Sequence, residues 1–327
     1  MKRALALALL LVGCRSEAHE PALAARTQAT KTNPVQKEKT APWSCGAVHE
    51  GARVSRPALG QKKRADGAIA IGLIADTREA KPETLGNLAR FSGVFRSEQV
   101  AAVVALGGLE STEQGIAEVL LALKGAGAPV FALPGDREPE KAFHAGVERA
   151  RQAGLDVTDL ALARAIAGGG LAILSLPGYR WPHYLTAGDF GCSYKAADVA
   201  ALAGLDAWLA ADRTRPILLV AYAPPRGDGP GALDWALGGA NVGDSDLARL
   251  LPSLHVRVGA FAHVDEAGGR QDDGKAPVPD RAWAERLYVN VGAADAVPHE
   301  LWPSGLSRGQ AMVVEIKDGK ARGKVIR

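Results

Sequence analysis

The sequence predicts an α/β fold in which buried strands alternate with helices. Five apolar stretches of strand length each end in polar residues or in glycine and proline. With their polar ends included, they cover residues 67–78, 101–108, 129–138, 216–225 and 256–265. Helical segments separate the first three stretches, and two successive β-α crossovers favour a largely parallel sheet. Parallel strands place their carboxyl ends at one edge of a sheet, so we expect one site built from five strand ends.

The helices follow from start signals and from the spacing of apolar residues. After the first strand, Pro82 stands near the first turn of a predicted helix, whose apolar positions repeat at helical spacing. These positions are Leu85, Leu88, Phe91 and Val94. Further helices are expected over residues 112–124, 139–153 and 195–211. Hairpins are expected over residues 163–176 and 311–326, and one more strand over residues 287–291.

The composition is that of an ordinary globular protein. The chain has 327 residues, of which 47% are hydrophobic and 23% are charged, enough for a sizeable core in one or two domains. A formal net charge of +3 does not favour a nucleic-acid partner, and none is expected.

The N-terminus predicts export. Lys2 and Arg3 precede an apolar run over residues 4–12, which is too short to span a bilayer and has the proportions of a signal-peptide core. The run ends in Leu11-Val12-Gly13-Cys14, which resembles a bacterial lipobox. The resemblance implies that residues 1–13 are removed and that Cys14 is lipidated. An ordinary signal peptide with an incidental cysteine is the alternative.

Lipidation would make the membrane a partner, because several acyl chains anchor a protein stably. Ser16 stands two places after Cys14, where inner-membrane lipoproteins carry a retention Asp, so the outer membrane facing the periplasm is the expected location. Residues 14–66 are rich in Ala, Thr, Lys, Glu and Pro and predict a flexible tether before a domain over residues 67–327, with an anchored patch around Pro42-Trp43-Ser44-Cys45 as an open alternative within it. Lys62-Lys63-Arg64 indicates a solvated end of this tether rather than a membrane or nucleic-acid contact.

Two cysteines remain after lipidation, Cys45 and Cys192. In an exported protein such a pair favours a disulfide, which would attach the end of the tether to the domain. Two buried free thiols are the alternative.

The polar ends of the five strands form an ordered set of motifs. They read Asp76-Thr77-Arg78, Gly107-Gly108-Leu109-Glu110-Ser111, Gly135-Asp136-Arg137-Glu138, Tyr222-Ala223-Pro224-Pro225 and Ala262-His263-Val264-Asp265. In order and spacing they resemble the calcineurin-like metallophosphoesterases, which carry D-x-H, G-D-x-x-D/N, G-N-H-D/E, a lone His and G-H-x-H. The resemblance covers residues 67–327. It implies an α+β four-layer fold, a double β-sheet sandwich flanked by helices.

The resemblance also implies a two-metal site, and this chain departs from its ligands. Two divalent metals would clamp a phosphate and activate a bridging water. The positions of the first metal hold Asp76, Arg78, Gly108 and Asp265, and those of the second hold Gly108, Asp136, Tyr222 and His263. The bridging carboxylate is absent at Gly108, and Arg137 replaces the assisting His. A guanidinium about 4 Å from a dication repels it by several kcal/mol, so Arg78 argues against two-metal hydrolysis.

Three interpretations remain open. In the first, the domain is a cofactor-free binding or structural module, in which Arg78 and Arg137 pair with nearby aspartates or bind phosphate or another anion. In the second, it is an atypical phosphoesterase with a single divalent metal of the Mn, Fe or Zn type, and Arg137 and Tyr222 are candidate catalytic residues. In the third, the resemblance misleads and the chain is another exported α/β protein. The candidate metal ligands are Asp76, Asp136, His263 and Asp265.

Each residue also has a purely structural interpretation. Asp76 could cap a helix or pair with Arg78, His263 could be a rim histidine, and the ring of Tyr222 could pack with its hydroxyl hydrogen-bonded. The segment Trp181-Pro182-His183-Tyr184 is either an aromatic rim of the site or a loop plug, and we prefer the plug. The sequence does not predict a substrate or a protein partner.

Overall fold

Two mixed β-sheets packed face to face form the core of the computed structural model, which describes residues 43–212 and 214–327. The six-stranded sheet has the order β17-β16-β2-β3-β4-β5, and the seven-stranded sheet has the order β1-β6-β7-β8-β11-β13-β12. In the first sheet, β2 to β5 are parallel and the β16–β17 hairpin is antiparallel to β2. In the second, β7, β8, β11 and β13 are parallel.

The strands agree closely with the apolar stretches of the sequence. The six-stranded sheet contains β2 (Ile69–Ile74), β3 (Ala102–Leu106), β4 (Val130–Leu133), β5 (Val157–Asp159), β16 (Ala311–Lys317) and β17 (Lys320–Ile326). The seven-stranded sheet contains β1 (Arg53–Ser55), β6 (Ala165–Ala167), β7 (Ala172–Leu176), β8 (Ile217–Ala221), β11 (Val258–Phe261), β12 (Gln271–Asp272) and β13 (Leu287–Asn290). Two small hairpins, β9 (Trp235–Ala236) with β10 (Ala240–Asn241) and β14 (His299–Glu300) with β15 (Leu306–Ser307), lie outside the sheets.

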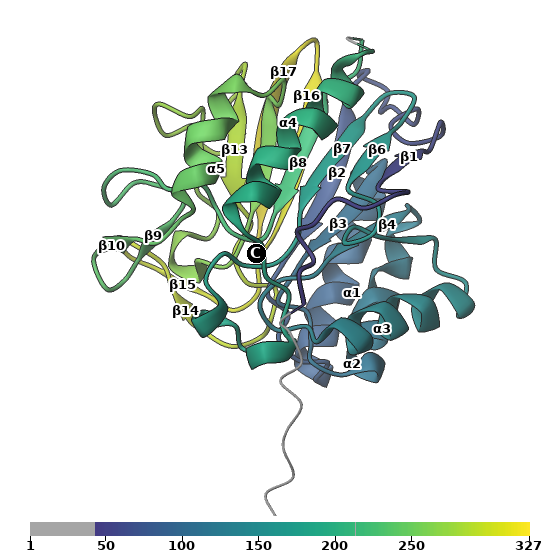
Figure 1. The fold of residues 1–327 in the computed structure, drawn as a ribbon, viewed down its shortest axis with the longest axis vertical. Coiled ribbons are helices and arrows are strands. Elements are labelled where there is room, and N and C mark those ends of the chain that lie inside the picture. Colours follow the sequence, from purple (N-terminus) through teal and green to yellow (C-terminus); the bar gives the residue numbers. More distant parts are fainter. Residues whose placement is uncertain (1–42, 213) are drawn as a thin grey trace, which may run out of the picture. The chain divides into compact units, whose positions relative to one another are not determined.

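Helices cover both outer faces of the sandwich. They are α1 (Pro82–Ser97), α2 (Glu113–Ala122), α3 (Glu140–Gln152), α4 (Ala196–Ala210) and α5 (Ser245–Leu250). Figure 1 shows α1, α2 and α3 together beside the six-stranded sheet, and α4 and α5 on the side of the seven-stranded sheet. The predicted α+β four-layer double sandwich is therefore confirmed.

Alternation along β2 explains why the central strands are apolar throughout. Ile71 and Leu73 point into a core that contains residues of both sheets. Ala70 and Ile74 point the other way, into a core shared with α1, α2 and α3. Successive side chains of a strand face opposite sides, so a strand covered on both faces needs apolar residues at every position.

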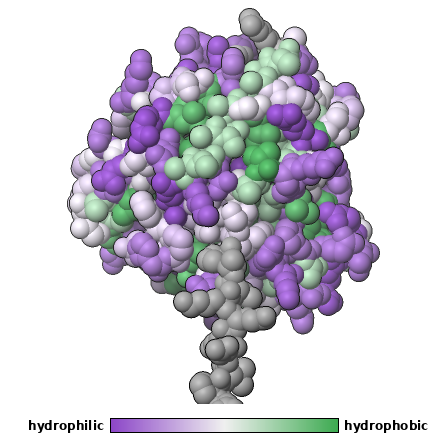
Figure 2. Space-filling view, viewed as in Figure 1, coloured by the Kyte–Doolittle hydropathy of each residue, from purple (hydrophilic) through white to green (hydrophobic). Residues whose placement is uncertain are grey.

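The outer surface is mostly polar. The face drawn in Figure 2 is largely hydrophilic, with small hydrophobic patches separated by polar residues. Within the described ranges, no helix combines the length and the apolar character that crossing a bilayer requires.

The end of the predicted tether belongs to the folded domain. β1 pairs in parallel with β6, Cys45 and Cys192 form a disulfide, and Arg64 donates to both Glu98 and Glu315 at 2.8 and 2.9 Å. The expectation of a flexible segment up to residue 66 is therefore wrong from residue 43 onward. Backbone pairing, the disulfide and ion pairs hold this segment together with a few buried apolar residues such as Ala52 and Leu59, and composition does not reveal such contacts.

A buried arginine also holds this segment. Arg164 is fully buried, and its guanidinium donates to the backbone carbonyl groups of Gly46 and Ser175. Burial lowers the pKa of Arg164 to about 10, so the group stays charged at neutral pH. The expectations for the signal peptide over residues 1–13, for lipidation of Cys14 and for a tether over residues 14–42 lie outside the described residues.

Candidate functional site

The five predicted strand ends meet at one place. The backbone N–H of Asp76, after β2, donates to Gly107 at the end of β3, and that of Arg78 donates to Gly108. Tyr222, after β8, reaches both Asp76 and Asp136, and the backbone N–H of His263, after β11, donates to Asp76 at 3.1 Å. The third interpretation predicts strand ends that lie far apart, and this prediction is wrong.

At the centre, the hydroxyl group of Tyr222 lies between two carboxyl groups. Its oxygen is 2.8 Å from Oδ1 of Asp76 and 2.8 Å from Oδ1 of Asp136. A phenol has one proton, so it donates to one carboxylate, and the other contact needs a proton on the carboxyl group. Burial, followed by the negative charge of Asp265, raises the pKa of Asp76 to about 7. Below about pH 7, the second proton is thus assigned to Asp76.

This assignment gives a directed chain of hydrogen bonds. Protonated Asp76 donates to Tyr222, and Tyr222 donates to Asp136, whose other oxygen accepts from Thr186 at 2.6 Å. Burial and the two adjacent carboxyl groups raise the pKa of Tyr222 well above its ordinary value, so its hydroxyl group stays protonated. Both oxygens of Asp136 are therefore occupied by hydroxyl donors.

Gly108 stands where the family has its bridging carboxylate, and the structure leaves no room for a side chain there. A Cβ atom at this position would collide with Oδ1 of Asp76. The backbone of Gly108 also has φ of +63°, a conformation that favours glycine. The carboxyl group of Asp76 thus occupies the space into which the bridging side chain would extend.

Arg78 belongs to a second polar cluster. Its guanidinium forms an ion pair with Asp265 and lies 3.8 Å from Oδ2 of Asp295. His299 donates to Asp295 at 2.7 Å and lies 3.5 Å from Asp265. The bond to Asp295 is the main cause that raises the pKa of His299. An arginine and a readily protonated histidine therefore face two buried aspartates.

The sequence analysis did not single out Asp295 and His299. Both follow the strand over residues 287–291, a sixth strand end that carries polar residues. The polar residues after this strand were the signal that could have indicated a sixth contribution to the site. The family motifs quoted above contain no counterpart of Asp295 or His299, so neither residue was singled out. Among the interpretations given for Arg78, pairing with an aspartate is the one the structure shows. This pairing engages Nη2 of Arg78, and anion binding at this residue stays a prediction.

His263 packs against aromatic rings. The centroid of its imidazole ring lies 4.1 Å from that of Tyr179 and 5.1 Å from that of Tyr222. Its φ is 69°, and Asp76 and Arg78 also have positive φ, of 47° and 58°. Non-glycine residues rarely adopt this conformation, and they cluster at functional sites. The site thus has the backbone geometry of a functional centre.

The loop after β4 is fixed by Glu138. This carboxyl group is fully buried and accepts from the backbone N–H groups of Leu109 and Gly135. Burial raises the pKa of Glu138 to about 8. Its neighbour Arg137 is half-buried, and no ion pair joins it to a residue in the described ranges.

An exposed aromatic loop borders the site. Trp181 is 44% exposed and Tyr184 is 64% exposed, so the preferred interpretation of this segment as a plug is wrong. Phe190, further along the loop, is 61% exposed. The same loop carries Thr186, which donates to Asp136, and Cys192 of the disulfide. The segment is therefore a rim that the disulfide attaches to the start of the domain.

The residues present do not fit the two metals that this constellation implies in the family. The bridging carboxylate has no space at Gly108, Tyr222 holds an oxygen of both Asp76 and Asp136, and Arg78 holds Asp265. Across residues 43–212 and 214–327, no three or more His, Cys, Asp or Glu side chains are grouped as metal ligands. The oxygens of Asp76 and Asp136 are directed to hydroxyl and amide donors, and Oδ2 of Asp265 to the guanidinium of Arg78. Oδ1 of Asp265 is buried and has no hydrogen-bond partner among the described residues.

Comparisons with known proteins show what the fold is similar to. No family model matches the chain, and no curated protein sequence matches it. The Thermus thermophilus protein TT1561 superposes with a TM-score of 0.54 and 13% identity, over 80% of this chain and 100% of that one. A structure described as GAP50, the anchor in the inner membrane complex of Plasmodium, superposes with a TM-score of 0.50 and 12% identity, over 79% of this chain and 84% of that one. A dimetal phosphatase from Danio rerio superposes with a TM-score of 0.49 and 13% identity, over 79% of this chain and 98% of that one. At these identities the similarity concerns the fold.

Proposed function

We propose that this chain, which has the fold of the calcineurin-like metallophosphoesterases, is a lipid-anchored protein of the bacterial envelope whose domain acts by binding a partner rather than by two-metal hydrolysis. Cys14 would carry the lipid, and the outer membrane facing the periplasm is the proposed location. Fold alone does not fix function, so the proposal depends on the site.

The observation that carries the proposal is the position of the Tyr222 hydroxyl group. It lies 2.8 Å from both Asp76 and Asp136, two residues that would otherwise be metal ligands. A metal at that place would have to remove the hydroxyl group and ionise Asp76, whose pKa burial raises to about 7. The hydrogen bonds therefore compete with a metal for the same oxygens.

The second cluster supports the same conclusion through charge. Arg78 and His299 face Asp265 and Asp295, so the guanidinium, and the imidazole when it is protonated, offset the carboxylates that a dication would otherwise neutralise. A guanidinium carries its charge at every physiological pH and does not exchange as a metal does. Such a site stabilises the loops without a cofactor.

The description of GAP50 as an anchor gives an analogy for a protein of this fold that attaches to a membrane. For the present chain, the lipobox-like Leu11-Val12-Gly13-Cys14 supplies the corresponding attachment. The partner that the domain would hold at the envelope is not specified by the strand-end site.

Metal analysis combined with an activity assay tests this proposal. The full chain, purified in detergent without chelator, would be analysed for Mn, Fe and Zn and then assayed on bis(p-nitrophenyl) phosphate with added Mn²⁺. We expect metal far below one equivalent per chain, and no turnover beyond that of the Asp136→Ala variant. Lys62→Gln, a change at an exposed residue outside the site, is the matched control.

The opposite result would be equally informative. One equivalent of metal, together with turnover that Asp136→Ala abolishes and Lys62→Gln retains, would contradict the binding role. It would establish an atypical metal-dependent phosphoesterase instead.

A further inference from the structure

A large cleft lies at the opposite end of the sheets from the candidate site. It has a volume of about 1020 Å³. Its floor includes Ile69, Ile217 and Val258, the first residues of β2, β8 and β11, and one wall is the turn between β16 and β17. The candidate site follows the last residues of the same strands. A strand of six residues is about 20 Å long, so the two places are distinct.

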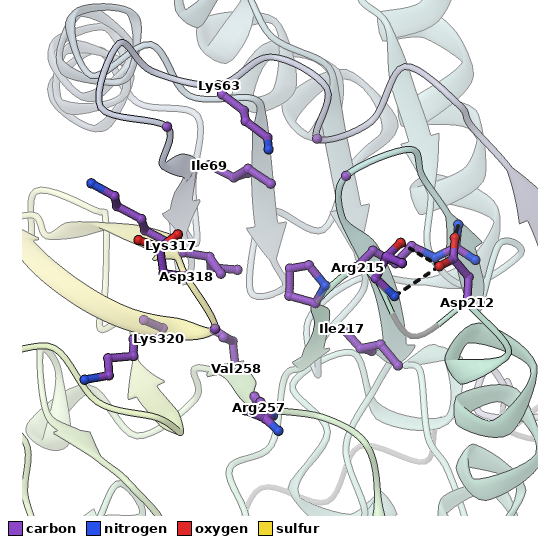
Figure 3. Close-up of a pocket in the computed structure, with 18 of the residues that line it drawn as sticks. Lys63, Ile69, Asp212, Arg215, Ile217, Arg257, Val258, Lys317, Asp318 and Lys320 are labelled. Carbon is purple, nitrogen blue, oxygen red and sulfur yellow. Dashed lines mark hydrogen bonds and ion pairs between the residues drawn. The ribbon is translucent and has the colours of Figure 1, made fainter.

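Cations surround this cleft. Figure 3 shows Lys63 on one side of it, Arg257 on another, and Lys317 and Lys320 on the hairpin wall. Within the part of the chain that the structure describes, no ion pair engages these four side chains. The hairpin lysines extend outward in the figure, and their flexible stems allow the ammonium groups to turn toward a ligand.

A fifth cation is only partly compensated. Arg215 forms an ion pair with Asp212 at 3.3 Å and donates to the carbonyl group of Gly168 at 2.7 Å. Its Nε–H is buried and has no hydrogen-bond partner among the described residues. The guanidinium charge of Arg215 is therefore offset by one carboxylate only, at the end of an ion pair of 3.3 Å.

The acidic residues of the cleft do not balance these charges. Asp212 is already engaged by Arg215 and by the hydroxyl group of Thr214, at 2.6 Å. The two other acids that line the cleft, Glu285 and Asp318, are exposed. Five lysine and arginine residues and three acidic residues therefore line the cleft, and this excess of positive charge attracts anions.

We propose that this cleft binds a small soluble ligand that carries two or more phosphate groups. The volume is at the upper end of the range of roughly 300–1,000 Å³ that is usual for small-molecule sites. The cations come from four separate segments of the chain, so one phosphate reaches only some of them, whereas an extended polyphosphate reaches several. The inference is independent of the proposed function, because it holds whether or not the strand-end site is catalytic.

Titration calorimetry with inorganic tripolyphosphate on the full chain in detergent tests this inference. We expect saturable binding at one site that weakens as salt is added, because the contacts are exposed ion pairs. Orthophosphate at matched ionic strength should bind at least tenfold more weakly. Lys63→Gln and Lys320→Gln should each lower the affinity for tripolyphosphate about two- to fivefold, which is the range for an exposed ion pair.

The adjacent lysine supplies the matched control. Lys62 is exposed and does not line the cleft, so Lys62→Gln removes the same charge without removing a contact. An equal loss in Lys62→Gln and Lys63→Gln would overturn the inference, because it would indicate a general charge effect. So would an absence of tripolyphosphate binding, equal affinity for orthophosphate, or a loss in Arg137→Gln that Lys63→Gln does not share.

Discussion

Proton sharing around Tyr222 makes Asp76 a determinant of stability. Burial raises the pKa of Asp76 from 3.8 to about 7, so the folded state binds a proton that the unfolded state has already released at neutral pH. The stability that depends on this proton is complete below about pH 4 and is lost as the pH rises toward 7. Burial raises the pKa of Glu138 to about 8, so its proton also stabilises the folded state at low pH and this contribution is also lost as the pH rises.

We predict that Asp76→Asn reduces the pH dependence of stability. An asparagine can donate to Tyr222 and accept from the backbone N–H of His263, as protonated Asp76 does. The wild-type free energy of unfolding should fall by a few kcal/mol between pH 4 and pH 7, at roughly 1.4 kcal/mol per pKa unit, and the variant should lose much of this slope. Urea titrations across this range measure both slopes. Equal slopes would contradict the proton assignment.

We also predict that Arg78→Ala destabilises the domain. It removes the guanidinium from two buried aspartates, Asp265 and Asp295, and leaves them only His299, which should cost about 1–3 kcal/mol because Arg78 is itself partly exposed. Arg78→Lys, which keeps the charge, is the control and should recover part of the loss in urea denaturation. If Arg78→Ala and Arg78→Lys had the same free energy of unfolding, the positive charge at this position would make no net contribution to stability.

At the residue scale, the sequence predicted positions better than interactions. The motif order placed Asp76, Asp136, Tyr222, His263 and Asp265 at strand ends that do meet. It could not predict that the tyrosine hydroxyl group would join two carboxyl groups. Such contacts depend on which loops pack together over more than 80 residues of sequence, and no local pattern records that.

At the scale of elements, apolar periodicity was sufficient wherever a segment is buried on two faces. The strand over residues 130–133 and the helices near residues 139–153 and 195–211 appear with small shifts at their ends. β1 and β5 were missed, because each has three residues and pairs at the edge of a sheet. Short edge strands carry too few apolar residues to show a period.

The disulfide should be the main stabiliser of the N-terminal segment. Cys45 and Cys192 are 147 residues apart in sequence, and loss of a native disulfide typically costs 2–5 kcal/mol. We predict a loss of about this size for the double variant Cys45→Ser, Cys192→Ser, measured by urea denaturation. The fold should persist, because Arg164 still donates to the carbonyl group of Gly46.

Reduction of the wild-type protein supplies the matched comparison. Dithiothreitol should lower wild-type stability to that of the double variant and leave the variant unchanged. A wild-type stability that does not respond to the reductant would contradict a stabilising role for this bond.

At the scale of the whole molecule, the proposals concern two ends of the domain and a predicted anchor. The strand-end site and the cationic cleft lie at opposite ends of the same strands, and the predicted lipid at Cys14 precedes both in the sequence. Sequence motifs predicted the strand-end site, and they also predict the lipid, which stays a prediction. The cleft escaped sequence reasoning because its cations come from four segments, among which only residues 62–64 form a visible charge cluster.

The proposed lipidation of Cys14 predicts that the chain is found in the membrane fraction of the cell. In a bacterial host supplied with labelled palmitate, the wild-type chain should carry label and sediment with membranes, and Cys14→Ser should lose both properties. Cys45→Ser, which removes a different cysteine, is the control and should remain labelled. Sedimentation of unlabelled Cys14→Ser with membranes would point to another mode of attachment.

The bond between Cys45 and Cys192 also determines how the domain responds to mechanical tension. It closes a covalent ring over residues 45–192, which contains β1 to β7 and the helices α1, α2 and α3. A pull applied between the N-terminal segment and the C-terminus passes across the sulfur atoms and bypasses the backbone of this ring. Under load, the chain after Cys192 can be drawn out, whereas the ring, which holds strands of both sheets, is not extended while the bond is intact.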